Sequence, residues 1–131
     1  MPDRPDTIAV TIAEPFEVAL RMVRRPLAME GLRVPAEIDI AARTLQELGV
    51  ELMNSVTLFV DTPALLLEAV RADPAGALTI PQSLALYSRG ETTRAVFRLQ
   101  PAYGPARELQ IRMTAALERI GSREIPLKAA S

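Results

Sequence analysis

Two acidic side chains two residues apart, Glu37 and Asp39, form the arrangement in this sequence best suited to chemistry. They lie in a stretch that alternates polar and apolar residues, so in a strand both carboxylates leave the same face. Coupled carboxylates can share a proton and act as an acid–base pair, or they can hold a hard cation such as magnesium. The alternative, which the alternating pattern favours, is that both are solvated or ion-paired on the wet face of a strand.

Two arginines, Arg94 and Arg98, share one face of a later predicted strand with Val96 between them. If that strand lay beside the strand carrying Glu37, cross-strand ion pairs would form. We expect such surface pairing. The alternative is that the two guanidinium groups bind a carboxylate or phosphate ligand.

Asp61 and Gln82 are two further candidates for ligand binding. Asp61 and Thr62 lie where a predicted strand leads into a helix, whose first backbone N–H groups could bind an anion. We expect instead that Asp61 caps the helix and occupies those donors itself. Gln82 interrupts an otherwise apolar row, so its amide needs hydrogen-bond partners. We expect these from the backbone at a bulge beside Pro81; the alternative is a small polar pocket.

The composition excludes several kinds of chemistry. The chain contains no histidine and no cysteine, so it lacks the usual zinc ligands and the imidazole of serine and cysteine nucleophile systems. We therefore expect no bound transition metal and no cofactor. The 15 basic residues nearly balance the 16 acidic ones, and there are only two tyrosines and three phenylalanines. Both observations argue against nucleic-acid binding.

The length and hydrophobicity indicate one domain. With 131 residues, of which 49% are hydrophobic, the chain can build one core without disulfides. We expect a single domain over residues 1–131, with flexible ends at 1–6 and 124–131. No apolar stretch is long enough for a signal or membrane segment, so a soluble cytoplasmic protein without membrane partners is expected.

Residue periodicity predicts alternating strands and helices. The expected fold is an α+β two-layer sandwich, with one mostly antiparallel sheet of about five strands backed by helices. In chain order the predicted elements are a strand over 7–13, a helix from 15, a strand over 32–40, a helix over 41–48, a strand over 56–60, a helix over 63–72, hairpin strands over 78–88 and 92–99, and a helix over 105–120.

Several residues should set local details of these elements. Pro26 should bend or end the first helix near Arg25, because its ring removes a hydrogen bond and crowds the preceding turn. Pro35 cannot donate to a strand neighbour, so its strand should lie at a sheet edge or contain a bulge. The alternation in that strand predicts one face made of Leu32, Val34, Ala36, Ile38 and Ile40. The strand over 56–60 should be buried on nearly both faces.

The middle of the chain resembles a known family. The resemblance is carried by residues 30–34, 36–40 and 45–50, then by Ala69–Pro74, Leu78–Pro81 and Gln100–Pro101. These blocks are similar to those of the domain of unknown function 302 family over roughly residues 14–120. The resemblance implies a curved sheet backed by helices, association as dimers and no established reaction. Many relatives carry cysteines where this chain has Asp61 and Gln82, so no thiol role transfers.

The residues and the resemblance together predict a homodimeric module without catalysis that binds a small anionic ligand or a protein partner. The predicted hairpin is apolar on both faces, so two copies should associate through the sheet or its edge. One face would carry Phe97, Leu99, Ala85 and Tyr87, and the other Leu84, Leu86 and Val96. The alternative is an enzyme in which Glu37 and Asp39 form the acid–base pair and Arg94 or Arg98 holds an anionic substrate.

Overall fold

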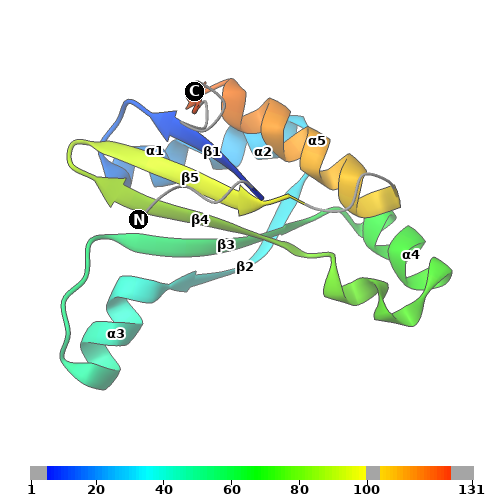
Figure 1. The fold of residues 1–131 in the computed structure, drawn as a ribbon, viewed down its shortest axis with the longest axis horizontal. Coiled ribbons are helices and arrows are strands. Elements are labelled where there is room, and N and C mark those ends of the chain that lie inside the picture. Colours follow the sequence, from blue (N-terminus) through cyan, green and yellow to red (C-terminus); the bar gives the residue numbers. More distant parts are fainter. Residues whose placement is uncertain (1–5, 100–103, 125–131) are drawn as a thin grey trace.

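The computed structural model describes residues 6–99 and 104–124. Within them a six-stranded antiparallel sheet has the strand order β2-β3-β4-β5-β1-β6 (Figure 1). The strands are β1 Thr7–Ile12, β2 Arg33–Asp39, β3 Ser55–Asp61, β4 Gln82–Arg89, β5 Thr92–Arg98 and β6 Ser122–Arg123. The helices are α1 Phe16–Met22, α2 Arg24–Met29, α3 Ile40–Leu48, α4 Pro63–Ala72, the 3₁₀ helix η1 Pro74–Leu78 and α5 Gly104–Glu118. The predicted α+β class is confirmed, with one strand more than expected.

The helices α1, α2 and α5 form one layer behind the sheet (Figure 1). Alternate residues of the central strands point into this layer, as the period-two pattern requires. On the other side of the sheet, no helix of the described residues crosses the strands. The core therefore lies on one side only. Its most completely buried side chains include Val10, Ile12, Leu58, Leu84, Leu86 and Phe97 of the sheet, and Val23, Leu27, Leu109, Met113 and Leu117 of the helical layer.

The first predicted helix is interrupted, as the proline indicated. α1 ends at Met22, and α2 begins at Arg24 and contains Pro26 as its third residue. Pro26 cannot donate to the carbonyl of Met22 and its ring crowds that carbonyl, so the break comes one turn before the proline. The break is thus earlier than the predicted position near Arg25. Ala19 before the break, Val23 at the break and Leu27 after it are all buried, so the inward face continues across it.

The strand β2 lies at the edge of the sheet, and its register against β3 shifts between Arg33 and Ala36. Both the edge position and the bulge expected around Pro35 are confirmed. The expectation that only one face of this strand is wet is wrong, because no residue of β2 is buried. Ala36 and Ile38 pair with Phe59 and Thr57, which face away from the helical layer, while Glu37 pairs with the core residue Leu58.

The hairpin of β4 and β5 turns at Gly90, whose φ of 64° favours glycine. Its first strand starts at Gln82 and not at residue 78, because Leu78 ends η1 and is 88% exposed. Leu84 pairs with Phe97, so these two face the core together, whereas Ala85 pairs with Val96 on the open face. The predicted grouping of Phe97 with Ala85 is therefore wrong. The strand β3 is likewise buried on one face only, since Thr57 and Phe59 are half-buried.

The short strand β6 was not predicted. It pairs with Val10 and Thr11 of β1 and closes the far edge of the sheet. Gly121 precedes it in close contact with β1, because a Cβ at this glycine would lie 2.6 Å from the Thr11 carbonyl oxygen. Among the described helices, none has both the length and the hydropathy for a transmembrane span.

We expect Gly121→Ala to destabilise the protein by about 1–3 kcal/mol, the typical cost of forcing an extra carbon into a closely packed site. The backbone carbonyl of Thr11 cannot move away without disturbing its strand, so this cost exceeds the smaller entropic gain that alanine brings in the unfolded chain. Urea unfolding measures the change. Ser122→Ala, at the exposed neighbouring residue, is the control. A Gly121→Ala variant as stable as this control would contradict the expectation.

Candidate functional site

Glu37 lies on the helix-facing side of the edge strand β2, where its carboxylate is bound by Arg24 of α2. The Arg24 guanidinium donates to Glu37 Oε2 at 2.6 Å, and both side chains are about half exposed. An exposed pair of this kind contributes little to stability. The ion pair nevertheless occupies the Glu37 carboxylate, which was a candidate for one half of an acid–base pair. The predicted ion pairing of Glu37 is thus present, with an arginine of α2 as its partner.

Asp39 is the last residue of β2 and the N-cap of α3. Its Oδ1 accepts the backbone N–H of Ala42 at 2.9 Å, which satisfies one of the unpaired donors of the first helical turn. Gly49 ends the same helix with φ of 66°, so the predicted end of this helix at residue 48 is confirmed. Asp39 also lines a shallow hollow between α3 and the segment that follows it. The two carboxylates share a face, but each is engaged by a different element of its own chain.

Arg94 and Arg98 lie far from Glu37. The strands β3 and β4 separate β5 from β2. At the usual spacing of neighbouring strands, β5 and β2 are therefore roughly 14 Å apart. Arg94 pairs with Thr11 and Tyr87 on the open face, opposite to the side of Glu37. The expected cross-strand pairing with Glu37 is therefore wrong. The structure does not bring the arginines to the acidic pair.

Arg94 instead belongs to a polar cluster at the β1–β6 edge. Its guanidinium makes two hydrogen bonds to the Glu124 carboxylate, at 2.8 and 3.0 Å, and a third to the Tyr87 hydroxyl at 2.7 Å. Thr11 donates its hydroxyl to the same carboxylate at 2.9 Å. The hydrogen bonds from Arg94 are the main reason that the pKa of Glu124 lies below its ordinary value of 4.5. Arg98 is exposed and forms no ion pair with the described residues.

Asp61 is the last residue of β3 and is only 8% exposed. The N-cap of α4 is Thr62, which makes no side-chain capping bond, so the predicted cap at Asp61 is wrong. The reason is that the strand continues through Asp61 and pairs it with Arg33 of β2. Pro63 then starts the helix at the position where its missing N–H has no cost.

Gln82 is buried at the start of β4, and its Nε2 donates to the backbone carbonyl of Arg98 at 3.2 Å. This confirms the expected pairing with the backbone. The ladder of β4 with β3 runs in regular register from Gln82 onward, so no bulge is needed for it. As for metal ions, no cluster of three or more acidic side chains that could hold one occurs in residues 6–99 and 104–124.

A larger surface feature was missed by the sequence interpretation. The helix α3 and the segment up to residue 54, here called the α3 arm, extend away from the rest of the chain (Figure 1). No residue of α3 is buried. In the sequence, the pattern of an amphipathic helix is followed by further apolar residues. Only the helix was predicted from this pattern, and the exposed apolar surface was not. The exposed apolar side chains of the arm are Leu45, Leu48, Val50, Leu52 and Met53.

Replacing Asp39 tests whether this carboxylate serves the helix. Asp39→Ala should remove the cap of α3 and cost about 1 kcal/mol, which corresponds to roughly fivefold faster amide exchange within α3. Asp39→Asn should keep most of the protection, because asparagine caps equally well. Hydrogen exchange followed by mass spectrometry measures the protection of α3 in both variants and in the wild-type protein. Equal loss in the alanine and asparagine variants would point to a role for the negative charge beyond capping.

The Arg94–Glu124 pair should make stability depend on pH. Because the folded-state pKa of Glu124 is lowered, its contribution is fully present above the unfolded value of 4.5 and is lost as the pH falls through the lower folded value. Arg94→Gln should raise the pKa of Glu124 and reduce this acid-dependent loss. Carboxyl NMR titration and urea unfolding at neutral and acid pH measure the two effects. The control is Arg89→Gln, since the Arg89 guanidinium lies 3.8 Å from the Glu124 carboxylate. This variant should change the Glu124 pKa and the pH dependence of stability much less. A variant lacking Arg94 with the wild-type pH dependence would contradict this.

Comparison with known proteins agrees with the resemblance seen in the sequence. The crystal structure of an uncharacterized conserved protein DUF302 from Bacillus stearothermophilus is similar with a TM-score of 0.79, at 20% sequence identity, covering 89% of this chain and 99% of that chain. At this identity the likeness shows a shared fold and carries no activity. No curated protein matches the chain. The family model of the domain of unknown function DUF302 matches residues 8–121, so the chain belongs to the DUF302 family.

Proposed function

We propose that the protein is a cytoplasmic homodimeric binding module without catalysis, in which the α3 arm joins two copies. The observation that carries this proposal is the exposed apolar side of the arm. Leu48 is 73% exposed and Leu45 is 49% exposed, one turn apart on the same side of α3. Val50, Leu52 and Met53 continue the apolar surface along the segment that follows.

The stability of α3 supports a covering partner. The helix has nine residues, and helices shorter than about 12–15 residues are marginal in water on their own. Its caps at Asp39 and Gly49 help, but no side chain of α3 is buried against the chain. Helices of globular proteins gain most of their stability from packing an apolar face, so the arm needs a surface to pack on.

The open face of the sheet offers a second apolar surface near the arm. Phe59 of β3 pairs with Ala36 of β2, and Ile38 follows two residues later on the same face. Phe59 is half-buried and Ile38 is exposed. No helix of the described residues covers these strands. An apolar arm and an uncovered apolar sheet on one chain are the two surfaces that a twofold dimer would bury together.

A second copy of this chain is the occupant that the charges favour. The arm carries Arg43, Glu47 and Glu51, so it bears both signs of charge. Such a mixture suits pairing with a copy of itself across a twofold axis, where each cation meets an anion. Association is also what the resemblance to the family implied. The resulting module would leave the other end of each subunit available for a ligand or protein partner.

The absence of catalysis rests on how the candidate groups are used. Arg24 binds Glu37, Asp39 caps α3 and Glu124 binds Arg94. Each of these acidic groups is engaged in holding two elements of its own chain together. An acid–base pair needs carboxylates that reach the same substrate atom, and neither Arg94 nor Arg98 lies on the face of Glu37.

Mass measurement of two matched variants tests the dimer. The wild-type protein should have twice the 14.3 kDa chain mass in light scattering at low micromolar concentration. Leu45→Glu combined with Leu48→Glu should yield monomers, because charges cannot be buried unpaired in an apolar interface. Circular dichroism checks that the variant remains folded.

The control is Leu67→Glu in α4, where the leucine is 52% exposed and therefore similar to Leu45. This variant should keep the wild-type mass. A monomeric wild-type protein that does not associate as concentration rises would overturn the proposal. So would a dimer that survives the double substitution in the arm while Leu67→Glu dissociates it.

A further inference from the structure

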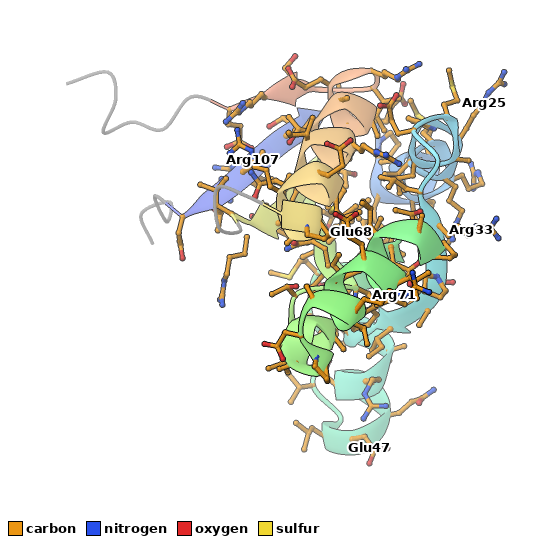
Figure 2. All side chains as sticks on the ribbon, turned by 90° about the vertical axis from the view of Figure 1, so that its right-hand side faces the viewer. Arg25, Arg33, Glu47, Glu68, Arg71 and Arg107 are labelled. Carbon is orange, nitrogen blue, oxygen red and sulfur yellow. The ribbon has the colours of Figure 1, made fainter. Side chains whose placement is uncertain are left out.

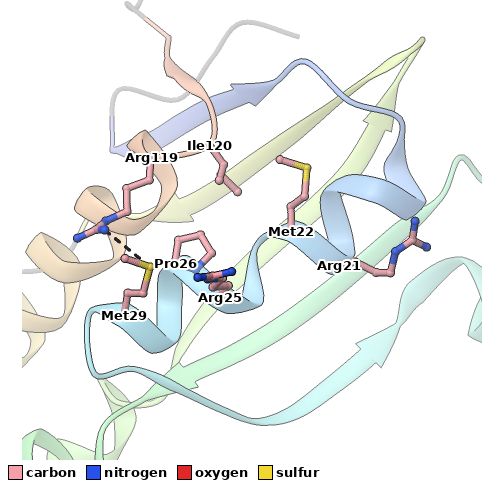
Figure 3. Close-up of a pocket in the computed structure, with 7 residues that line it drawn as sticks. All are labelled: Arg21, Met22, Arg25, Pro26, Met29, Arg119 and Ile120. Carbon is pink, nitrogen blue, oxygen red and sulfur yellow. Dashed lines mark hydrogen bonds between the residues drawn. The ribbon is translucent and has the colours of Figure 1, made fainter.

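A groove lies between the interrupted helix α1–α2 and the residues that follow α5. It has a volume of about 560 Å³, within the usual range for small-molecule sites. Figure 3 shows the side chains that line it. The lining consists of Arg21, Met22, Arg25, Pro26, Met29, Arg119 and Ile120. None of the ligand candidates inferred from the sequence is among these residues.

The floor of the groove is apolar and is set by the helix geometry. Met22 and Pro26 are four residues apart across the break at Val23, so they lie on one side of the helical segment. Ile120 faces them from beyond α5 (Figure 3). Met29 extends this apolar surface at the end of α2. Methionine side chains are unbranched and flexible, so this floor can adapt to an alkyl or aryl group.

The rim of the groove is cationic. Arg119 donates to Glu30 Oε2 at 2.7 Å and lies 3.8 Å from the Met29 sulfur. Arg21 and Arg25 are exposed and form no ion pair or side-chain hydrogen bond with the part of the chain that the structure describes. Glu17 lies one turn before Arg21 without pairing to it. Three guanidinium groups therefore border this apolar floor, and within residues 6–99 and 104–124 only that of Arg119 is paired with a carboxylate.

From this combination we propose that the groove binds an amphiphilic anion, a carboxylate or phosphate attached to an alkyl or aryl body. The body lies on Met22, Pro26 and Ile120, and Arg25 holds the anionic group. Arg25 is the guanidinium placed beside Pro26, whereas Arg21 lies farther along the groove (Figure 3). Guanidinium groups bind carboxylate and phosphate oxygens through paired, charge-assisted hydrogen bonds, while an apolar floor excludes a fully hydrated anion.

This site goes beyond the proposed dimer and is separate from the α3 arm. In Figure 2, Arg25 and Glu47 of α3 lie at opposite ends of the molecule. Ligand binding and self-association can therefore be tested independently. The arm variant with Leu45→Glu and Leu48→Glu should bind the ligand as the wild-type protein does. Failure of the dimer would leave the groove intact, and failure of the groove would leave the dimer intact.

Calorimetric titration with decanoate tests the chemical class. Decanoate should bind saturably below its micelle concentration. Decyltrimethylammonium, with the same chain and a positive head, should bind at least about tenfold more weakly, because its head meets guanidinium groups. Equal binding of both would overturn the proposal, since it would reflect apolar adsorption alone. The absence of saturable decanoate binding would overturn it as well.

Substitution of the rim arginines tests the location. Arg25→Gln should weaken decanoate binding by about tenfold or more, the usual effect of losing a charge-assisted hydrogen bond, and Arg21→Gln should weaken it less. Arg71→Gln in α4 removes another exposed arginine that forms no ion pair with the described residues, and it should leave binding unchanged. Equal effects of Arg25→Gln and Arg71→Gln would overturn the assignment, because only net charge would then matter.

The methionine methyl groups provide an independent reporter, since the chain has five methionines. In NMR spectra of methyl-labelled protein, decanoate should shift the signals of Met22 and Met29. The signal of Met53 in the α3 arm should stay in place. Movement of Met53 without Met22 would place the ligand on the arm and overturn the proposal. Binding to phosphatidylglycerol vesicles without binding of free decanoate would also overturn it, since a membrane surface would then be the ligand.

Discussion

The inward-facing side chains of β1, β3, β4 and β5 pack against a single layer of helices, and the rest of the structure depends on this contact. Its central members are completely or almost completely buried. Because all the helices of the layer lie on one side, β2 and α3 are held mainly by pairing with β3 and by their own caps. The apolar side chains of Ala36 and Ile38 in β2 and of Leu45 and Leu48 in α3 consequently remain at the surface. The exposed arm follows from a one-sided core.

Local residue patterns predicted the elements of this core well. The alternation over β1 indicated the buried Ile8, Val10 and Ile12, although Ala9 is buried too, and Gly49 and Gly90 lie at a helix end and a hairpin turn. These features depend on residues close in the sequence, whose backbone preferences act without help from the rest of the chain. Strand order is different in kind. Whether β5 lies beside β2 or β1 depends on contacts between distant segments, and alternation carries no information about them.

The same distinction explains the outcome for the polar residues. Asp39 was recognised as a chemically capable carboxylate, and its partner Ala42 is only three residues away, yet its role as a cap was overlooked in favour of pairing with Glu37. The partners of the other groups are more distant in sequence. Arg24 and Glu37 are 13 positions apart in the sequence, and Arg94 and Glu124 are 30 positions apart. Neither pairing leaves a periodic signal, because side-chain partners of this kind are chosen by the packed fold.

The two edges of the sheet have a consequence for how this protein resists aggregation. At one edge, Pro35 and the shifted register of β2 interrupt the row of backbone donors, and at the other, β6 is only two residues long. An edge shortened or kinked in this way is a poor template for adding a strand from another molecule. The contact between copies that we propose would therefore have to use side chains. Such contacts can close about a symmetry axis, whereas strand addition would continue into an open fibre.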